Sequence, residues 1–291
     1  MDAVELLPTC VIADDLDQWL REDGLDEGDV TSEVLPEGDA AASYRLVART
    51  PMIVCGLEPV SRGLAALQSD VSLAPAVDEG MRVGPAAVLG TLAGDRRTAL
   101  ALERTILNIL GRTCGVASLT RRYVDAVAGT RAVITDTRKT MPGLRAWDKY
   151  AVVIGGGASH RIGLDDAALF KDNHFAGMPL DAMASTLADA IVRARADRDL
   201  AFVEVEVDTL EQFDLVLKVP GVDIVLLDNM PPDMMREAVR IRDDRAAGVL
   251  LEASGGITLD TVRAVAESGV DRIALGGLTR DATMLDIGLD A

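Results

Sequence analysis

The sequence lacks both a membrane-spanning segment and a secretion signal. Hydrophobic residues make up 49% of its 291 positions, but no apolar run approaches the roughly 18 residues that a membrane span requires. The opening stretch MDAVELLPTC has neither the basic start nor the apolar block of a signal peptide. We therefore expect a cytoplasmic protein with a real hydrophobic core, long enough for about two domains.

Cysteine is scarce. The chain has only Cys10, Cys55 and Cys114, an odd number that lie far apart and without CxxC spacing. This pattern argues against a disulfide framework and against a zinc site. We expect reduced, partly buried thiols.

Lysine is rare in a strongly acidic chain. The formal net charge is −18, which argues against nucleic acid or an anionic membrane as a partner, because the average surface repels a polyanion. Only four of the 29 basic residues are lysines. Two explanations stay open: a halophilic protein whose self-repulsion is screened by salt, and compositional drift in a GC-rich genome.

The scarce cations gather in one window, which begins with the stretch DTRKTMPGLR at 136–145. A lone histidine is more often structural than catalytic, and a single basic run is more often a solvated face. Here both histidines of the chain and three of its four lysines fall between residues 136 and 174. This concentration predicts an anion-binding site. Its members are Arg138, Lys139, Arg145, His160, Arg161, Lys171 and His174.

A succession of strand-like and helix-like segments fills the second half of the chain. Short β-like runs occupy residues 202–208, 223–229, 249–256 and 271–278, with helix-like segments between them. Such a βα succession predicts parallel strands in a barrel or an open α/β sheet. RAVIT at 131–135 is expected to be an earlier strand of the same array.

The run FVEVEVD at 202–208 places three valines on one face and Glu204, Glu206 and Asp208 on the other. Three carboxylates under covering helices would carry a large desolvation cost. We therefore expect the valines to face the helices and the acids to face a wet or ligand-filled barrel interior. The alternative is an edge strand with one solvated face.

Polar residues and glycines follow the predicted strands, where ligands of βα barrels bind. Glycine pairs are mostly turns, but backbone N–H groups in two such turns at helix N-termini can bind a phosphate. The residues at these ends are Asp228, Asn229, Ser254, Gly255, Gly256, Gly276 and Gly277.

The first hundred residues follow another pattern. DDLDQWLREDG at 14–24 predicts a short amphipathic helix, GDVTSEVLPEG at 28–38 a turn-rich link, and SYRLVARTPMIVCGLE at 43–58 a pair of strands. TALALERTILNILGRTCG at 98–115 predicts one helix. On it Arg104 and Arg112 lie about two turns apart and could share a face.

These ordered motifs resemble those of the quinolinate phosphoribosyltransferases, the carboxylating nicotinate-nucleotide pyrophosphorylases. The core of the resemblance is DTRKTMPGLRAWDKYAVVIGGGASHRIGLDDAALFKDNH at 136–174. GDVTS and ERTILNILGRTCGVASLT precede it, and EVEVDTLEQ, LLDNM, LEASGGI and GVDRIALGGLT follow it. The resemblance covers nearly the whole chain.

The resemblance implies an N-terminal α/β sandwich domain over 1–112, completed by the tail 279–291, and an open, TIM-barrel-like α/β barrel over 113–278. It implies a homodimer, or a hexamer built as a trimer of dimers, with each active site at a subunit interface. The implied reaction is a step of NAD biosynthesis: quinolinate and 5-phosphoribosyl 1-diphosphate, with Mg²⁺ as cofactor, give nicotinate mononucleotide, diphosphate and CO₂.

The resemblance also implies residue roles. The quinolinate carboxylates would be bound by Arg138, His160, Arg161 and Lys171, with Arg104 entering from the other subunit. The expected catalytic residues are Lys139, which would attend the phosphoribosyl diphosphate, and Glu206 and Asp228, which would stabilise the oxocarbenium-like ribose or hold its hydroxyls and Mg²⁺. The 5-phosphate would be held by Ser254, Gly255, Gly256, Gly276 and Gly277. Metal ligands stay open.

Departures from the family pattern and rival functions remain. Ser159 stands where asparagine is expected, and Gly277 and Arg280 stand where alanine and histidine are frequent. The rivals are a paralogue associated with molybdenum transport, a nicotinate-using phosphoribosyltransferase, and a non-catalytic barrel that senses metabolites or acts as a scaffold. KDNH, EVEVD and an intact Arg104 favour the quinolinate enzyme over the first, and paired groups for two carboxylates argue against the second. A non-catalytic barrel would be expected to have lost cations or carboxylates of the site, and the sequence keeps them.

Overall fold

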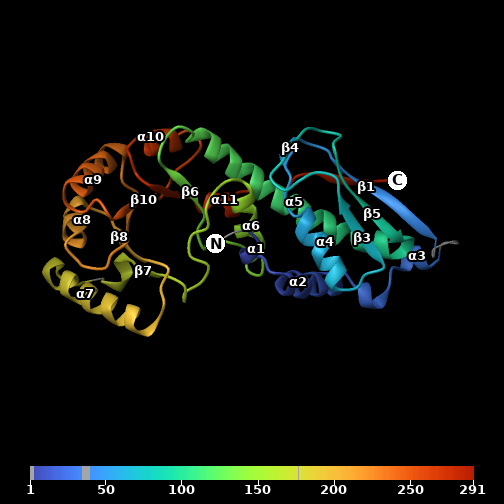
Figure 1. Cartoon of the computed structure of the whole chain (residues 1–291), viewed down its shortest axis with the longest axis horizontal. Helices are drawn as coiled ribbons and strands as arrows, with labels where there is room; N and C mark the ends of the chain where they lie inside the picture. The colour runs from blue at the N-terminus through green and yellow to red at the C-terminus, as the bar shows by residue number, and fades with distance from the viewer. Residues whose placement is uncertain (1–2, 35–39, 176) are drawn as a thin grey trace. The chain divides into compact units, whose positions relative to one another are not determined.

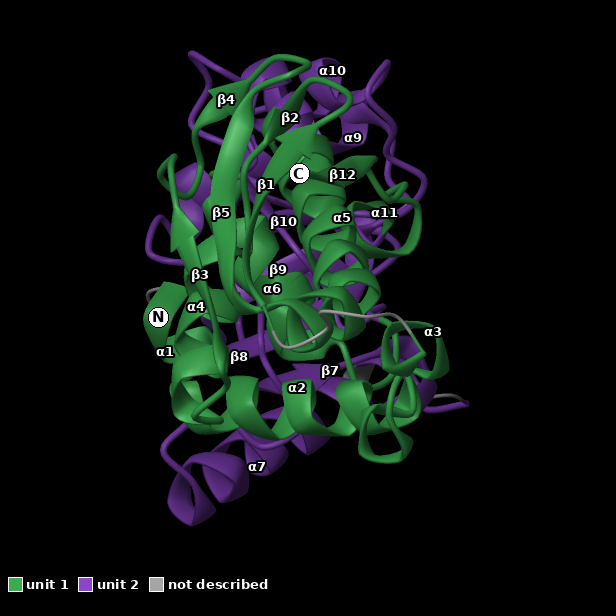
Figure 2. Ribbon diagram, turned by 90° about the vertical axis from the view of Figure 1, so that its right-hand side faces the viewer, with its two compact units in different colours: residues 1–121, 141–156, 277–291 green, residues 122–140, 157–276 purple. Residues whose placement is uncertain are grey.

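The computed structural model describes residues 3–34, 40–175 and 177–291. The chain forms two compact units, coloured separately in Figure 2. Unit 1 comprises Met1–Arg121, Met141–Gly156 and Gly277–Ala291, and unit 2 comprises Arg122–Thr140 and Gly157–Gly276. The domain ranges given above stay a prediction, and residues 35–38 of the expected link lie outside the described residues.

Unit 1 contains a four-stranded antiparallel sheet in the order β12-β1-β5-β3 (Figure 1). The last strand of the chain pairs with β1, with Arg45 opposite Asp290 and Ala48 opposite Ile287. The expected pair of strands at 43–58 forms as β1 and β2, although β2 pairs with β4 and not with β1. The bounds are β1 Ala41–Ala48, β2 Met52–Ile53, β3 Val71–Pro75, β4 Arg82–Val83, β5 Val88–Asp95 and β12 Ile287–Asp290.

Two predicted helices of unit 1 are confirmed. α2 buries Ile12, Leu16 and Leu20 at helical spacing, and it packs on α4 at Gly63, where a Cβ would lie 2.2 Å from Leu16 Cδ1. The expected helix at 98–115 is longer, because α5 runs without a break for 31 residues. The helices are α1 Ala3–Leu6, α2 Thr9–Glu22, η1 Leu25–Glu27, α3 Val30–Glu33, α4 Leu57–Ala66, α5 Arg96–Ala126, α6 Arg145–Ile154 and α11 Gly277–Arg280.

Unit 2 is an open α/β barrel with six parallel strands in the order β6-β11-β10-β9-β8-β7. β7 to β11 follow one another in the chain and lie side by side, and β6 pairs with β11, which is the arrangement of a βα barrel left open between β6 and β7. The predicted fold class is therefore confirmed. The alternative of an edge strand at 202–208 is wrong, since β8 lies between β7 and β9. The bounds are β6 Val133–Thr135, β7 Ala168–Phe170, β8 Val203–Val207, β9 Ile224–Asp228, β10 Leu250–Ser254 and β11 Arg272–Ala274.

The helices of unit 2 follow their strands, and Figure 1 shows α8, α9 and α10 on the outer side of β8, β9 and β10. α8 begins with a capping box at Thr209. The Thr209 side chain accepts a hydrogen bond from the backbone N–H of Gln212, and the Gln212 side chain accepts one from the backbone N–H of Thr209. Prolines begin α9, where a missing N–H costs nothing. The bounds are η2 Asp172–His174, α7 Leu180–Asp197, α8 Leu210–Val216, α9 Pro232–Arg245 and α10 Val262–Ala266.

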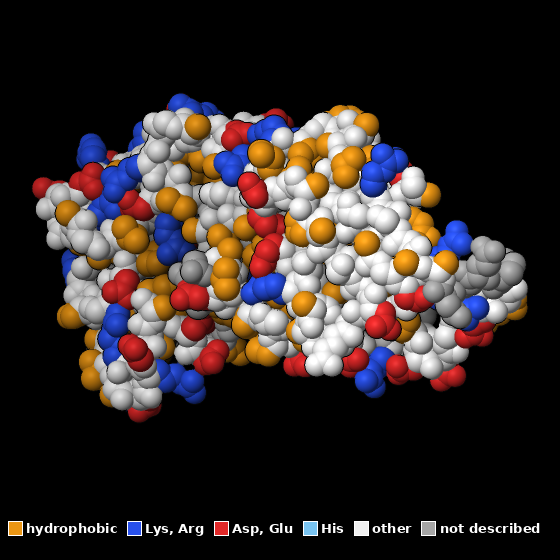
Figure 3. All heavy atoms as spheres, turned by 45° about the vertical axis from the view of Figure 1, so that its right-hand side comes forward, with side chains coloured by type: hydrophobic (Ala, Val, Ile, Leu, Met, Phe, Trp, Pro, Cys, Tyr) orange, Lys and Arg blue, Asp and Glu red, His pale blue; other side chains and the backbone are white. Residues whose placement is uncertain are grey.

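None of the described helices combines the length and the apolar character needed to cross a membrane. On the face drawn in Figure 3, acidic and basic side chains are interspersed over the surface. All three cysteines are free thiols, with Cys10 exposed and Cys55 and Cys114 buried.

Candidate active site

The carboxyl ends of the unit 2 strands carry most of the predicted site residues. Asp228 and Ser254 are the last residues of β9 and β10, and Lys171 follows β7 directly. Because parallel strands end at one edge of the sheet, these positions lie at the same end of the barrel. The predicted residues in unit 2 are Arg138, Lys139, His160, Arg161, Lys171, Glu206, Asp228, Ser254, Gly255, Gly256 and Gly276, whereas Arg104 and Gly277 belong to unit 1.

Arg138 and Arg161 bring two guanidinium groups together. The pKa of Arg161 is lowered, first by burial and then by the positive charge of Arg138. The Nε of Arg138 is buried without a hydrogen-bond partner among the described residues. An anion would satisfy this donor and offset the repulsion between the two cations. The pair therefore has the character of a carboxylate or phosphate site.

Lys171 and Glu206 form an ion pair beside this site. The side chain of Lys171 is 42% exposed and that of Glu206 only 10%. The ammonium group is thus within reach of a solvent-borne ligand, while the carboxylate is held deeper on β8. An anion that binds Lys171 has to compete with Glu206.

Three aspartates face one another at the same strand ends. The pKa of Asp208 is raised, first by burial and then by the charges of Asp228 and Asp172. The side-chain amide of Asn229 donates to Asp228 Oδ2 at 2.6 Å. Mutually repelling carboxylates suit a hard divalent cation such as Mg²⁺, which prefers oxygen ligands and offsets their charge.

A second charged cluster is buried beneath the strand ends. His160 Nε2 lies 3.0 Å from Glu204 Oε2 and 3.1 Å from Glu252 Oε1, and both glutamate side chains are fully buried. Arg272 Nε lies 2.8 Å from the other oxygen of Glu252. His160, Glu204 and Glu252 together have the composition of a metal site. The guanidinium group of Arg272, however, already supplies a cation to this cluster.

This cluster corrects the expectation for the strand FVEVEVD. The valines are buried as predicted, but Glu204 is also completely buried and does not face a wet interior. His160 lies 3.0 Å from Oε2 and offsets part of the cost of burial, but neither oxygen of Glu204 accepts a hydrogen bond of normal geometry among the described residues. Exposure increases along the strand, from Glu204 through Glu206 to the exposed Asp208, so only the end of the acidic face is open to solvent.

The surroundings of this cluster raise the pKa of both His160 and Glu204. Burial acts to lower the pKa of His160, but the hydrogen bonds and charges of Glu204 and Glu252 outweigh it and raise the pKa to about 9. Burial and the charge of Glu252 also raise the pKa of Glu204. His160 Nδ1 accepts the amide N–H of Arg161 at 2.7 Å, which requires an unprotonated Nδ1. This contact opposes the second ring proton that the two carboxylates favour, and it assigns the proton of the neutral ring to Nε2.

Backbone conformation or lack of space for a Cβ explains why glycine stands at these strand ends. Gly255 has φ +92°, and a Cβ there would lie 2.2 Å from Asn229 Oδ1. Gly256 has φ +61° with open space around it. A Cβ on Gly276 would meet Lys139 Cδ at 2.7 Å, so this glycine leaves room for the lysine side chain.

Unit 1 holds Arg104 on the exposed side of α5, 4.0 Å from Glu103. Arg104 and Arg112 line the same cleft, whose volume is about 780 Å³. Arg112, in contrast, makes hydrogen bonds of 3.0 Å from Nε and Nη2 to the buried carboxylate of Asp148. Arg112 is thus committed to the fold. Trp19, Asn108, Pro142, Trp147 and Arg280 are other residues that line the cleft.

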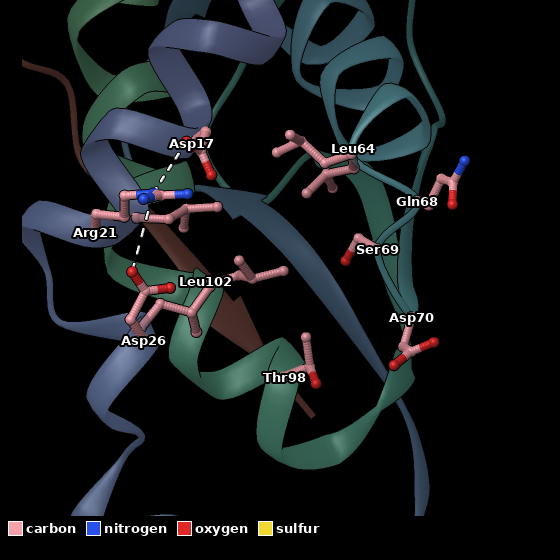
Figure 4. Close-up of a pocket in the computed structure, with 12 residues that line it drawn as sticks. Asp17, Arg21, Asp26, Leu64, Gln68, Ser69, Asp70, Thr98 and Leu102 are labelled. Carbon is pink, nitrogen blue, oxygen red and sulfur yellow. Dashed lines mark ion pairs between the residues drawn. The ribbon is translucent and has the colours of Figure 1, made fainter.

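A smaller pocket of about 290 Å³ also lies in unit 1, between α2, α4 and the start of α5 (Figure 4). Its one arginine, Arg21, is paired with Asp17 at 3.0 Å and lies 3.9 Å from Asp26. No predicted site residue lines it. We assign it no part in the site.

Sequence reasoning missed three residues that support the site. Glu252 and Arg272 belong to the buried cluster, and Asp136 Oδ1 accepts the backbone N–H of His160 at 2.8 Å. The available signal for Asp136 was its place in the DTRK motif. A single acid in the strand LLEAS gave no comparable signal for Glu252.

Comparison with known proteins agrees with this geometry. Residues 29–114 match the quinolinate phosphoribosyl transferase N-terminal domain and residues 116–290 the C-terminal domain. Nicotinate-nucleotide pyrophosphorylase [carboxylating] of Mycobacterium leprae is 40% identical over 264 residues, covering 90% of each chain. A probable nicotinate-nucleotide pyrophosphorylase of Bacillus subtilis is 35% identical over 94% of this chain and 91% of that protein. The nicotinate-nucleotide pyrophosphorylase structure from Francisella tularensis superposes with a TM-score of 0.85 at 32% identity, covering 97% and 96% of the two chains. The chain belongs to the quinolinate phosphoribosyltransferase family.

Proposed function

We propose that this protein is a quinolinate phosphoribosyltransferase, which converts quinolinate and 5-phosphoribosyl 1-diphosphate into nicotinate mononucleotide, diphosphate and CO₂. The observation that carries the proposal is the pair Arg138 and Arg161, in which the charge of Arg138 acts on the partly buried Arg161 and lowers its pKa, while Arg138 Nε is buried without a hydrogen-bond partner among the described residues. Such a pair matches a ligand with two carboxylates better than a ligand with one. With Lys171 nearby in the sequence motif KDNH, the site offers a cation for each end of quinolinate.

Phosphoribosyl diphosphate is assigned to the glycine-rich strand ends. Ser254, Gly255 and Gly256, together with Gly276 and Gly277, would present backbone N–H groups to the 5-phosphate, because no Cβ blocks a close approach. Lys139 would meet the diphosphate as a compact point charge.

The carboxylates of the site fit the charge that develops during transfer. As diphosphate leaves, C1′ of the ribose becomes positively charged, and Glu206 and Asp228 would stabilise it. When bound, Mg²⁺ would neutralise the diphosphate, and Asp172, Asp208 and Asp228 are the carboxylates that could hold it. The pyridine nitrogen then forms the bond to C1′ as the bond to diphosphate breaks. The positive charge on the nitrogen stabilises the carbanion that loss of CO₂ leaves at C2, and uptake of a proton at C2 gives nicotinate mononucleotide.

A homodimer would complete the site, with Arg104 of one subunit contacting quinolinate bound to the other. The exposure of Arg104 and its weak pairing to Glu103 support this assignment. Arg112 could not take this role at low cost, because its guanidinium group is paired with the buried carboxylate of Asp148.

The test is incubation with phosphoribosyl diphosphate and Mg²⁺, with either quinolinate or nicotinate, at low and at molar salt. We expect nicotinate mononucleotide and CO₂ from quinolinate and no nucleotide from nicotinate. Activity only at molar salt supports halophilic adaptation, whereas equal activity at low salt supports compositional drift. Nucleotide formed from nicotinate alone would contradict the proposed substrate.

A further inference from the structure

We propose that Glu204 and Glu252 are positioning residues for the dicarboxylate site, acting through His160 on Arg161. The inference rests on the proposed function, since quinolinate is the ligand whose two carboxylates need the arginines at a fixed separation. Neither glutamate is expected to touch the substrate, because both side chains are fully buried.

The imidazole of His160 connects these glutamates to the backbone of Arg161. Nε2 lies 3.0 Å from Glu204 and 3.1 Å from Glu252, and Nδ1 accepts the amide N–H of Arg161 at 2.7 Å. Nδ1 is thus held by a hydrogen bond, whereas Nε2 lies at ion-pair distance from two carboxylate oxygens that accept no hydrogen bond of normal geometry among the described residues. The ring orients the residue that follows it in the chain.

A second connection ties the ring to the other arginine. The backbone N–H of His160 donates to Asp136 Oδ1 at 2.8 Å, and Asp136 lies two residues before Arg138 in the same loop. The segments that carry Arg138 and Arg161 are thus joined at His160. A change in the position of the ring would alter the separation of the two guanidinium groups.

Charge provides the reason for two glutamates at this place. Arg138 and Arg161 repel each other, and the charge of Glu204 acts on Arg161 in the opposite direction to that of Arg138. Arg272 balances Glu252 from the far side, at 2.8 Å. Phe202 closes the cluster, with its ring 5.3 Å from the His160 ring and 5.5 Å from the Arg272 guanidinium. This arrangement holds two like charges together without exposing the counter-charge to the substrate.

The first test is calorimetric titration of quinolinate into Glu204→Gln, Glu252→Gln and the double variant, beside steady-state kinetics. We expect each single change to weaken quinolinate binding about 10- to 100-fold, with kcat and the KM for phosphoribosyl diphosphate changed less than about threefold. Because both glutamates act through one ring, the double variant should lose far less than the product of the two single losses. Unchanged quinolinate affinity in folded single variants would overturn the proposal.

The matched control is Glu79→Gln. Glu79 is a partly buried glutamate whose pKa is also raised by burial, but it lies in unit 1, where it accepts the N–H groups of Gly56 and Glu58 at the start of α4. This variant should lose stability and keep its quinolinate affinity. Equal losses of affinity in Glu79→Gln and Glu204→Gln would assign the effect to general destabilisation and would overturn the proposal.

The second test does not depend on activity. The chain has two histidines, so untagged His174→Gln protein leaves His160 as the one source of imidazole ¹⁵N signals. The contact at Nδ1 predicts an unprotonated Nδ1 and a protonated Nε2 at pH 7, against the second ring proton that the two carboxylates favour. Glu204→Gln together with Glu252→Gln should lower the pKa of the ring, because burial then acts without the opposing carboxylate charges. A doubly protonated ring, or a normal titration with both glutamates present, would overturn the link to Arg161. If the unaltered protein neither binds nor converts quinolinate, the proposed function fails, while this spectrum still decides the positioning of the ring.

Discussion

The ion pair between Lys171 and Glu206 leads to a prediction in which binding and catalysis change in opposite directions. This carboxylate is paired with the ammonium group of Lys171, which is assigned to quinolinate. Glu206→Gln removes the competing charge and at the same time removes one carboxylate assigned to the developing ribose cation. The variant should therefore bind quinolinate more tightly and turn it over more slowly.

The structure sets the size of both changes. Lys171 is 42% exposed, so the pair is worth up to about 1 kcal/mol, and its removal lowers the KM for quinolinate by up to about fivefold. Glu206 is only 10% exposed, and charge stabilisation in such a site contributes more. Loss of one preorganised group typically lowers kcat about 100-fold.

Steady-state kinetics with quinolinate varied at saturating phosphoribosyl diphosphate measures both quantities. Glu211→Gln is the control, because Glu211 is an exposed residue near the start of α8 and its loss should leave both constants within about twofold. A raised KM together with a lowered kcat in Glu206→Gln would refute the reasoning, since it would mean that Glu206 aids quinolinate binding.

Three further predictions concern the subunit interface, the phosphate loop and the pH dependence of stability. Arg104→Ala and Lys171→Ala should each be inactive, but mixing them should restore about a quarter of wild-type activity, because half of the dimers are mixed and each has one intact site; a mixture as inactive as its parents would count against a shared site. Gly255→Ala should lower the thermal midpoint and raise the KM for phosphoribosyl diphosphate, because φ is +92° and the new Cβ would meet Asn229 Oδ1 at 2.2 Å, at a cost of at least about 1–3 kcal/mol. Gly256→Ala should cost less stability, because φ is +61° and no atom lies within 4 Å of the new Cβ. Equal losses of stability in the two variants would contradict the steric argument. Burial raises the pKa of Glu79 above 4.5, so the carboxyl group stays protonated to a higher pH in the folded state than in the unfolded chain. The contribution of this group to stability is therefore present below pH 4.5 and is lost as pH rises through the pKa of the folded state. Urea unfolding of Glu79→Gln between pH 4.5 and 7 should therefore show a smaller loss of stability with rising pH than the wild type, and identical slopes would contradict the raised pKa.

The barrel strands could be predicted because they are apolar and evenly spaced, but the local pattern did not reveal all of the fold. β7 has only three residues, Ala168–Phe170, which is too short to show a periodicity. The pairing of β12 with β1 joins opposite ends of the chain, and it followed from the family resemblance and not from the pattern.

The candidate site was predictable to the extent that its cations are rare in this chain. Lys139 and Lys171 stood out because the chain has only four lysines, whereas Arg138 and Arg161 were singled out by the window that they share with these lysines, since arginine is abundant in the chain. The alternation of apolar and acidic residues in FVEVEVD predicted the correct face of the strand for Glu204 but not its burial. The residues that surround its carboxylate, His160 and Glu252, come from distant segments of the chain. Burial and pairing of a charge depend on such non-local contacts, which periodicity does not encode.

The central claim is the reaction itself, and quinolinate labelled with ¹³C in its 2-carboxylate tests it most directly. With phosphoribosyl diphosphate and Mg²⁺, one labelled CO₂ should be released for each nicotinate mononucleotide formed, and neither product should appear when phosphoribosyl diphosphate is left out. Nucleotide that retains the label, or the absence of both products from folded protein at low and at molar salt, would contradict the account.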